Sequence, residues 1–142
     1  MIHTFFKRLR ILLKKIDQIK ISAATSEDIA LLDKEMPFGP SSYFQDTFKE
    51  QEHGRLIFLV ARNGKEPIGH AALILDGPKE AEVVELLKGT PELSAVEVKP
   101  EKRSLGVGSQ IIEQAEEAVK EAGKDKICIG VSEENPRAQA LY

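Results

Sequence analysis

The sequence has few of the features that indicate secretion, membrane insertion or a metal centre. Its single cysteine, Cys128, cannot form an intramolecular disulfide, and its three histidines do not cluster with it at zinc-site spacing. No stretch approaches the roughly 18 uninterrupted apolar residues of a membrane-spanning helix. Ten glycines and seven prolines among 142 residues exclude a collagen-like or low-complexity chain. We therefore expect a cytoplasmic globular protein that binds no metal.

The length and composition favour one folded domain. A chain of 142 residues with 42% hydrophobic and 30% charged side chains is long enough for a single buried core and too short for two ordinary domains. A formal net charge of −3 argues against intrinsic disorder. Near the N-terminus, Lys14 and Lys15 interrupt the apolar run Ile11–Leu13, which is too short for a signal peptide.

The charge is unevenly distributed between the first residues and the rest. Residues 1–20 carry a net charge of +5, so the remaining chain carries −8. Large apolar residues recur every three or four positions from Ile2 to Ile19, which predicts an amphipathic basic helix over residues 1–18. Three interpretations stay open: a helix packed on its own domain, upstream sequence from a misplaced start site, or weak attachment to anionic lipid or a partner groove.

Periodicity and turn residues predict the elements of a second region, residues 19–142. Thr25 and Asp28 resemble a capping box, Pro37–Pro40 must break a helix, and Asn63–Gly64 indicates a hairpin. The expected order is a strand at 19–23, helices from Thr25 and from Ser41 or Ser42 to Gly54, strands at 55–62 and 68–75, a short helix or irregular insertion at 79–88, a strand at 92–98, a helix at 106–122, a strand at 126–131 and a helix start at 135–136.

This order predicts an α/β (α+β) fold with a mixed, mostly antiparallel sheet flanked by helices. The helix between the strands at 92–98 and 126–131 has the length of a crossover connection, so those two strands should be parallel. No internal repeat divides the region.

The segment Val98–Ser109 has the features of an anion-binding site. It reads as a strand, a short basic loop and a helix start that contains Gly106 and Gly108. The first turn of a helix offers unpaired N–H groups and a positive dipole end, and Arg103 adds charge-assisted hydrogen bonds. Ile111 stands where a dinucleotide fingerprint needs its third glycine, and the Gly-Lys-Ser/Thr of a Walker loop is absent from the sequence.

Two motifs resemble those of the GNAT acyltransferases. Arg103-Ser104-Leu105-Gly106-Val107-Gly108 matches the Arg/Gln-x-x-Gly-x-Gly/Ala motif, and residues 135–142 match Asn-x-x-Ala-x-x-Leu-Tyr. The resemblance implies an acetyl-CoA co-substrate, with its pyrophosphate on the 103–109 loop and its pantetheine arm along a bulged strand whose free N–H groups polarise the thioester. It implies these cofactor-binding residues: Val96, Val98, Arg103, Ser104, Leu105, Gly106, Val107, Gly108, Ser109 and Asn135.

The resemblance also suggests catalytic residues. An amine attacks only when neutral, and Glu92 aligns with a position from which some family members supply a carboxylate base. Glu97 is the second choice, expected by strand alternation on the opposite face from Glu92. Tyr142 aligns with the tyrosine that protonates the departing thiolate. His53, His70 and Cys128 are assigned no role.

The expected activity is therefore direct acetyl transfer from acetyl-CoA to a primary amine, with the acceptor entering over the loop at 36–43. The acidic body favours a cationic acceptor and disfavours nucleic acid. A homodimer stays open. Family members continue beyond the Leu-Tyr pair, so we expect a C-terminally truncated domain. Two alternatives remain: a non-catalytic CoA-binding or regulatory module, and a membrane- or partner-docking protein.

Overall fold

The computed structural model describes residues 19–77 and 89–130. The predicted N-terminal helix, the segment 79–88, Asn135 and Tyr142 lie outside the described residues. Within them, the order of elements is as expected from the sequence. The elements are β1 (Ile19–Ala23), α2 (Ser26–Glu35), α3 (Tyr43–Glu52), β2 (Leu56–Asn63), β3 (Glu66–Ile74), β4 (Glu92–Val98), the 3-10 helix η1 (Pro100–Lys102), α5 (Val107–Glu121) and β5 (Cys128–Ile129).

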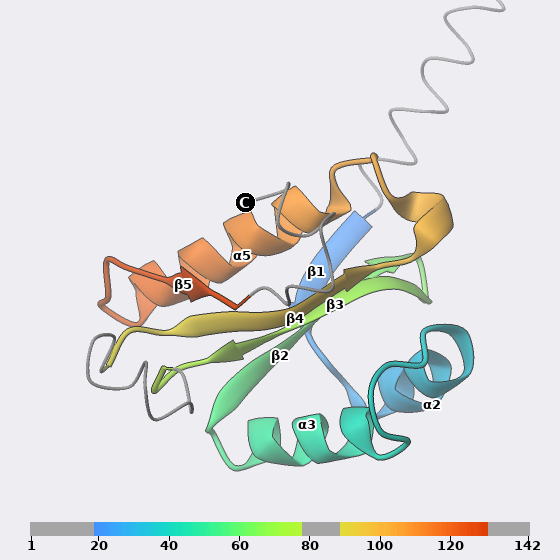
Figure 1. Cartoon of the computed structure of the whole chain (residues 1–142), viewed down its shortest axis with the longest axis horizontal. Helices are drawn as coiled ribbons and strands as arrows, with labels where there is room; N and C mark the ends of the chain where they lie inside the picture. The colour runs from blue at the N-terminus through green and yellow to red at the C-terminus, as the bar shows by residue number, and fades with distance from the viewer. Residues whose placement is uncertain (1–18, 78–88, 131–142) are drawn as a thin grey trace, which may run out of the picture.

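The strands form one sheet in the order β1-β2-β3-β4-β5, between two layers of helices. Neighbouring strands are antiparallel except β4 and β5, which are parallel. Helix α5 lies on one face of the sheet, and α2 and α3 lie on the other (Figure 1). The α+β class and the parallel pairing of the last two strands are thus confirmed.

Each face of the sheet has its own apolar core. Helix α5 buries its regularly spaced Val107, Ile111, Ala115 and Val119 against one face, although Ala122, expected on the same stripe, is exposed. On the other face, α2 and α3 pack with the buried strand residues Phe58 and Val60. Strand β3 is buried on both sides along most of its length because helices cover both faces of the sheet. In the described part of the chain, no helix is long and apolar enough to cross a membrane.

Two strand predictions are corrected. Asn63 pairs with Glu66, so the two-residue hairpin turn is Gly64-Lys65 and the return strand starts before Ile68. Gly64 has φ = 65°, a conformation that glycine adopts without steric cost. Strand β5 covers only Cys128–Ile129, because the residues preceding it lie beyond the start of β4 and have no strand opposite them.

A buried ion pair anchors the start of α2 to the sheet. Asp28 accepts a hydrogen bond from the Thr25 backbone N–H at 2.7 Å, as the capping-box motif predicts, and from Arg62 Nε on β2 at 2.8 Å. Burial alone would raise the pKa of the Asp28 carboxyl, but the hydrogen bonds from Arg62 and Thr25 outweigh it and hold that pKa below its usual range. The anchor positions α2 and, through it, the loop that leads to α3.

Candidate functional site

Strand β4 carries a β-bulge. His70 pairs with Glu97 and Ala72 pairs with Ser94, so the single residue between them on β3 faces two residues, Ala95 and Val96, on β4. Ala95 adopts φ = 54°, which is unusual for a residue with a Cβ atom and is the kind of strain found at functional sites. The bulge that the family resemblance implies is therefore present.

The bulge reverses one expectation from strand alternation. Glu97 pairs with His70, Ser94 with Ala72 and Glu92 with Ile74, and side chains of directly paired residues share a face of the sheet. Glu97 therefore lies on the same face as Glu92, toward α2 and α3, and not on the opposite face. The extra residue in the bulge shifts the alternation by one position.

Beyond the bulge, one edge of β4 is available for an added chain. Strand β5 pairs with β4 at Glu92 and Leu93, and hydrogen bonds at 2.9 Å run from Cys128 N–H to the Pro91 oxygen and from Gly130 N–H to the Leu93 oxygen. Lys99 N–H donates to the Ile68 oxygen on β3 at 2.9 Å. Because successive residues of a strand point their N–H and C=O groups to opposite edges, those of the preceding residue, Val98, point away from β3. In the described part of the chain, no strand pairs with that edge beyond Leu93.

The loop after β4 leads into a helix N-terminus built for an anion. Ser104 and Gly106 adopt φ = 70° and 80°, and α5 begins at Val107 with the first turn closed by Gln110 N–H donating to the Gly106 oxygen at 3.0 Å. The N–H groups of residues 107–109 have no partner within the helix, and the first turn holds no acidic residue. A Cβ atom at Gly106 would meet no described atom within 4 Å, so a phosphate can approach the backbone.

Arg103 lies at the junction of the strand edge and this loop. Its Nε donates to the Val98 oxygen at 3.1 Å, and its Nη2 lies 3.9 Å from the Glu97 carboxylate. About a third of its side chain is exposed (35%), so it can still contact a bound anion. The structure thus brings the predicted cofactor residues from Val96 to Ser109 into one continuous strand edge, loop and helix start, whose donors fit a pyrophosphate and an extended arm.

Glu92 lies at the far end of β4 from this loop. It pairs with Ile74 and with Cys128, and its negative charge adds to burial in raising the pKa of the Cys128 thiol. Six residue steps along the strand, about 20 Å at the usual rise, separate it from Val98. Of the two carboxylates considered as bases, Glu97 is the one beside the loop.

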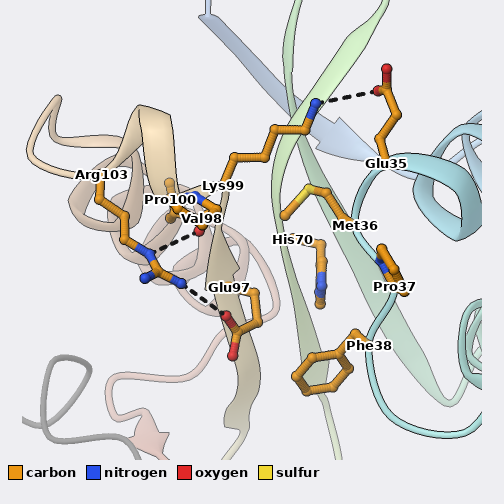
Figure 2. A pocket seen from close by; sticks show the side chains of 10 residues that line it. All are labelled: Glu35, Met36, Pro37, Phe38, His70, Glu97, Val98, Lys99, Pro100 and Arg103. Atoms are coloured by element: carbon orange, nitrogen blue, oxygen red, sulfur yellow. Dashed lines mark hydrogen bonds and ion pairs between the residues drawn. The ribbon is translucent and has the colours of Figure 1, made fainter.

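A pocket of about 260 Å³ opens between β4 and the segment after α2. In Figure 2 the strand with Glu97 forms one wall, the segment with Pro37 and Phe38 forms the other, and His70 lies between them. The described residues that line it are Glu35, Met36, Pro37, Phe38, His70, Glu97, Val98, Lys99, Pro100 and Arg103. The loop at 36–43, predicted as the acceptor entrance, therefore contributes to this pocket.

A second pocket, of about 410 Å³, lies on the same face of the sheet between α3 and the strands. Its lining includes Tyr43 and Thr47 from α3, Ala72 from β3 and Ser94 from β4. Burial raises the pKa of the Tyr43 phenol, which therefore stays neutral.

His70, to which sequence analysis assigned no role, is a buried titratable group at the smaller pocket. Its side chain is 1% exposed, and among the described residues neither ring nitrogen has a hydrogen-bond partner. The rings of Phe38 and Phe44 pack edge-on against it with centroids 5.1 Å away. Burial lowers the pKa of the imidazole to about 4, so the ring is neutral at physiological pH.

Lys99 is a second residue that sequence analysis did not single out. Its Nζ bonds to Glu66 at 2.9 Å and to Glu35 at 3.4 Å, while its side chain is almost wholly buried. Burial would lower the pKa of this amine, but the hydrogen bonds to the two carboxylates outweigh it and raise that pKa. In the sequence, the only local feature that distinguishes Lys99 from the other lysines is its position directly after a predicted strand.

No cluster of metal-ligand side chains occurs within residues 19–77 and 89–130.

A sheet with a bulged β4, a parallel β5 and, between them, a helix that starts at a glycine-containing loop has the architecture of a GNAT-type acyltransferase. The sequence model described as the acetyltransferase (GNAT) family matches residues 26–142. The chain therefore belongs to the GNAT acetyltransferase family.

Solved structures share this fold at low sequence identity. A transcriptional regulator from Bacillus halodurans C-125 is 21% identical with a TM-score of 0.70, over 87% of this chain and 89% of that chain. The aminoglycoside N-acetyltransferase AAC(6')-Iy, solved with a CoA bisubstrate analogue, is 17% identical with a TM-score of 0.67, over 87% and 86%. A ribosomal-protein-alanine N-acetyltransferase from Brucella melitensis biovar Abortus 2308 is 16% identical with a TM-score of 0.67, over 87% of both chains. No sequence among the curated proteins matched significantly.

Proposed function

We propose that this protein transfers an acetyl group from acetyl-CoA directly to a primary amine. The observation that carries the proposal is the continuity of the strand edge after the β4 bulge with the anion-binding start of α5. Family membership supports acyl transfer, and structures of the similar AAC(6')-Iy hold CoA or a CoA-based analogue.

The residues would divide the work of binding the co-substrate. The N–H groups of residues 107–109 and the Arg103 guanidinium would hold the pyrophosphate, and the edge of β4 at Val96 and Val98 would pair with the extended pantetheine arm. Acetyl-CoA supplies an activated thioester. Asn135 and Tyr142 keep the roles that the motif suggests, as a cofactor-binding residue and the acid that protonates the departing thiolate.

The acceptor must lose a proton to react. An alkyl ammonium has a reference pKa of about 10.4, so a base beside the acceptor raises the fraction of neutral amine. Glu97 lines the pocket next to the anion loop and is better placed for this task than Glu92. The amine nitrogen then forms a bond to the acetyl carbon, and the C–S bond to CoA breaks.

A covalent acetyl-cysteine intermediate is disfavoured. Cys128 is the single cysteine of the chain, and burial together with the nearby Glu92 charge raises the pKa of its thiol. A nucleophilic cysteine needs the opposite shift, toward the thiolate. Direct attack by the acceptor is therefore the favoured mechanism.

Calorimetric titration with acetyl-CoA tests the cofactor site. Ser109→Trp places an indole over the start of α5 from an exposed position, whereas Lys120→Trp makes the same change at an exposed position near the other end of that helix. We expect binding to the wild type and to Lys120→Trp, and at least tenfold weaker binding to Ser109→Trp. No binding to the folded wild type would overturn the proposal.

Release of free CoA tests catalysis. The protein is incubated with acetyl-CoA and a broad panel of primary amines, and the new thiol is measured with a chromogenic reagent. We expect amine-dependent release. Tight acetyl-CoA binding with no release from any amine would instead identify a non-catalytic CoA-binding module.

A further inference from the structure

We propose that His70 and Glu97 form the polar wall of the acceptor site and that the acceptor is a compact primary monoamine with an apolar body. This substrate class rests on the function proposed above. Neither residue belongs to the two sequence motifs, and His70 lies on β3 and not on the loop that would hold the pyrophosphate.

The state of His70 points to a ligand. A buried polar group without a hydrogen-bond partner destabilises a fold, and such groups are rare in native proteins, where a catalytic role or a bound partner is one explanation for them. Both nitrogens of His70 are in this state among the described residues, and the ring lines the 260 Å³ pocket. A neutral imidazole presents one donor and one acceptor, so a polar group of the acceptor can pair with it without adding charge.

Glu97 supplies the negative charge next to His70. The two residues are direct partners across β3 and β4 and share one face of the sheet because of the bulge at Ala95. The Glu97 side chain is 27% exposed, and the ion pair of its carboxylate with Arg103 is long, at 3.9 Å. It is therefore accessible to an incoming ammonium group and placed to accept its proton.

The local charges favour an acceptor with one positive charge. Lys99 is compensated by Glu35 and Glu66, and Arg103 is the other cation at the pocket. Of the two carboxylates that line the pocket in the described part of the chain, Glu35 is paired with Lys99 at 3.4 Å, whereas Glu97 has only the longer contact with Arg103. Glu97 can therefore pair with one ammonium group, whereas further amino groups on the same acceptor would meet Lys99 and Arg103.

The size and lining of the pocket set the body of the acceptor. About 260 Å³ is just below the usual range for drug-sized ligands, so the pocket suits a small molecule and cannot enclose a multi-ring amino sugar. Met36, Pro37 and Phe38 supply an apolar wall opposite Glu97 (Figure 2). An alkyl or aryl group fits that wall while its amine faces Glu97.

Steady-state kinetics with a matched amine panel tests the substrate class. The panel is 2-phenylethylamine and n-butylamine against spermidine and kanamycin, with acetyl-CoA saturating. We expect kcat/KM for the better monoamine to exceed that for spermidine and kanamycin at least tenfold. A preference for either polyamine overturns the substrate class while leaving acetyl transfer established.

NMR of the protein labelled with 15N-histidine tests the site separately from turnover. We expect 2-phenylethylamine, added to the protein in the presence of CoA, to shift the His70 ring nitrogens and not those of the exposed His53. If no amine releases CoA, the proposed function fails, yet a His70 shift still supports an amine site. Absence of a His70 shift overturns the site, whatever the turnover shows.

Substitutions separate binding from structure. His70→Phe should raise the acceptor KM at least tenfold, leave acetyl-CoA affinity unchanged and raise the melting temperature, because it removes an unpaired polar group. His70→Gln, which keeps a donor and an acceptor, should retain a lower KM than His70→Phe. An unchanged KM in both variants would mean that His70 is only structural.

Glu97→Gln tests the carboxylate. We expect kcat to fall at least tenfold at neutral pH and to recover partly as the pH rises, because more of the acceptor is then neutral. The control Glu117→Gln removes an exposed carboxylate from α5 and should change neither value. Equal effects of the two substitutions would overturn the role of Glu97.

Discussion

Arg103 bonds back to the strand that precedes its own loop, with its Nε donating to the Val98 carbonyl oxygen at 3.1 Å. The guanidinium is thereby held beside the open edge of β4 and close to the start of α5. A single side chain thus links the two parts of the candidate site, the strand edge and the anion-binding loop.

Removing this guanidinium should weaken cofactor binding. Arg103→Ala is expected to lower acetyl-CoA affinity about tenfold, since a charge-assisted hydrogen bond contributes about 1.5 kcal/mol. The loss should shrink at high salt because part of it is electrostatic. Calorimetry at two ionic strengths measures both effects. Arg55→Ala, which removes an exposed cation paired with Glu50, should bind acetyl-CoA like the wild type.

Two glycines of α5 allow a matched comparison. Gly106 and Gly123 flank the helix with φ = 80° and 79°, and a Cβ atom at either would meet no described atom within 4 Å. Replacing either glycine with alanine should therefore lower the free energy of unfolding by a similar amount, about 1–2 kcal/mol. Gly106→Ala alone should also weaken acetyl-CoA binding, because its Cβ atom lies at the anion site. Equal affinities in the two variants would contradict the placement of that site.

The Arg62–Asp28 pair should be important for stability. Arg62→Met leaves the buried Asp28 carboxylate without its main partner, and we expect a loss of about 3 kcal/mol, measured by urea unfolding. Arg55→Met breaks an exposed pair and should cost less than about 0.5 kcal/mol. Similar losses in the two variants would show that the pair does not anchor α2.

The burial of His70 in its neutral form should make the stability of the fold depend on pH. Its pKa is about 4 in the folded chain and near 6.5 when unfolded, so between these values the unfolded state binds more protons. Stability should therefore fall as the pH drops from about 6.5 to 4, by a total of about 3 kcal/mol from this group. Thermal melts of the wild type and His70→Phe check this. The variant should lose less stability over that pH range, and parallel curves would contradict the burial of a neutral His70.

Local patterns predicted the helices and the loop well. Apolar residues recur at helical spacing in α5, and β4 has the bounds expected from the sequence, between Pro91 and Pro100. The loop and helix start of the candidate anion site were also predictable, because the free N–H groups of a helix start are a local consequence of backbone geometry. The helix bounds predicted from capping residues and helix breakers, such as Thr25 and Gly54, were confirmed for the same reason.

Three features escaped sequence analysis. Nothing in the sequence around Ala95 indicates a positive φ, so the prediction that Glu97 lies on the opposite face of the sheet from Glu92 was wrong. The hairpin turn was placed one residue early because Asn63 continues the ladder to Glu66. His70 carried no signal because its burial depends on Phe38 and Phe44, which come from another part of the chain.

The amino-acid sequence by itself determined the order of strands and helices, the parallel last strand and the glycine-containing loop that starts α5, since these follow from side-chain periodicity and backbone hydrogen bonding over a few residues. Only the tertiary structure decided which face of the sheet carries Glu97, that His70 is buried without a hydrogen-bond partner among the described residues, and how Lys99 is neutralised. Those properties depend on the register between β3 and β4 and on helices packed from distant segments, where desolvation and charge pairing arise only after the chain has folded.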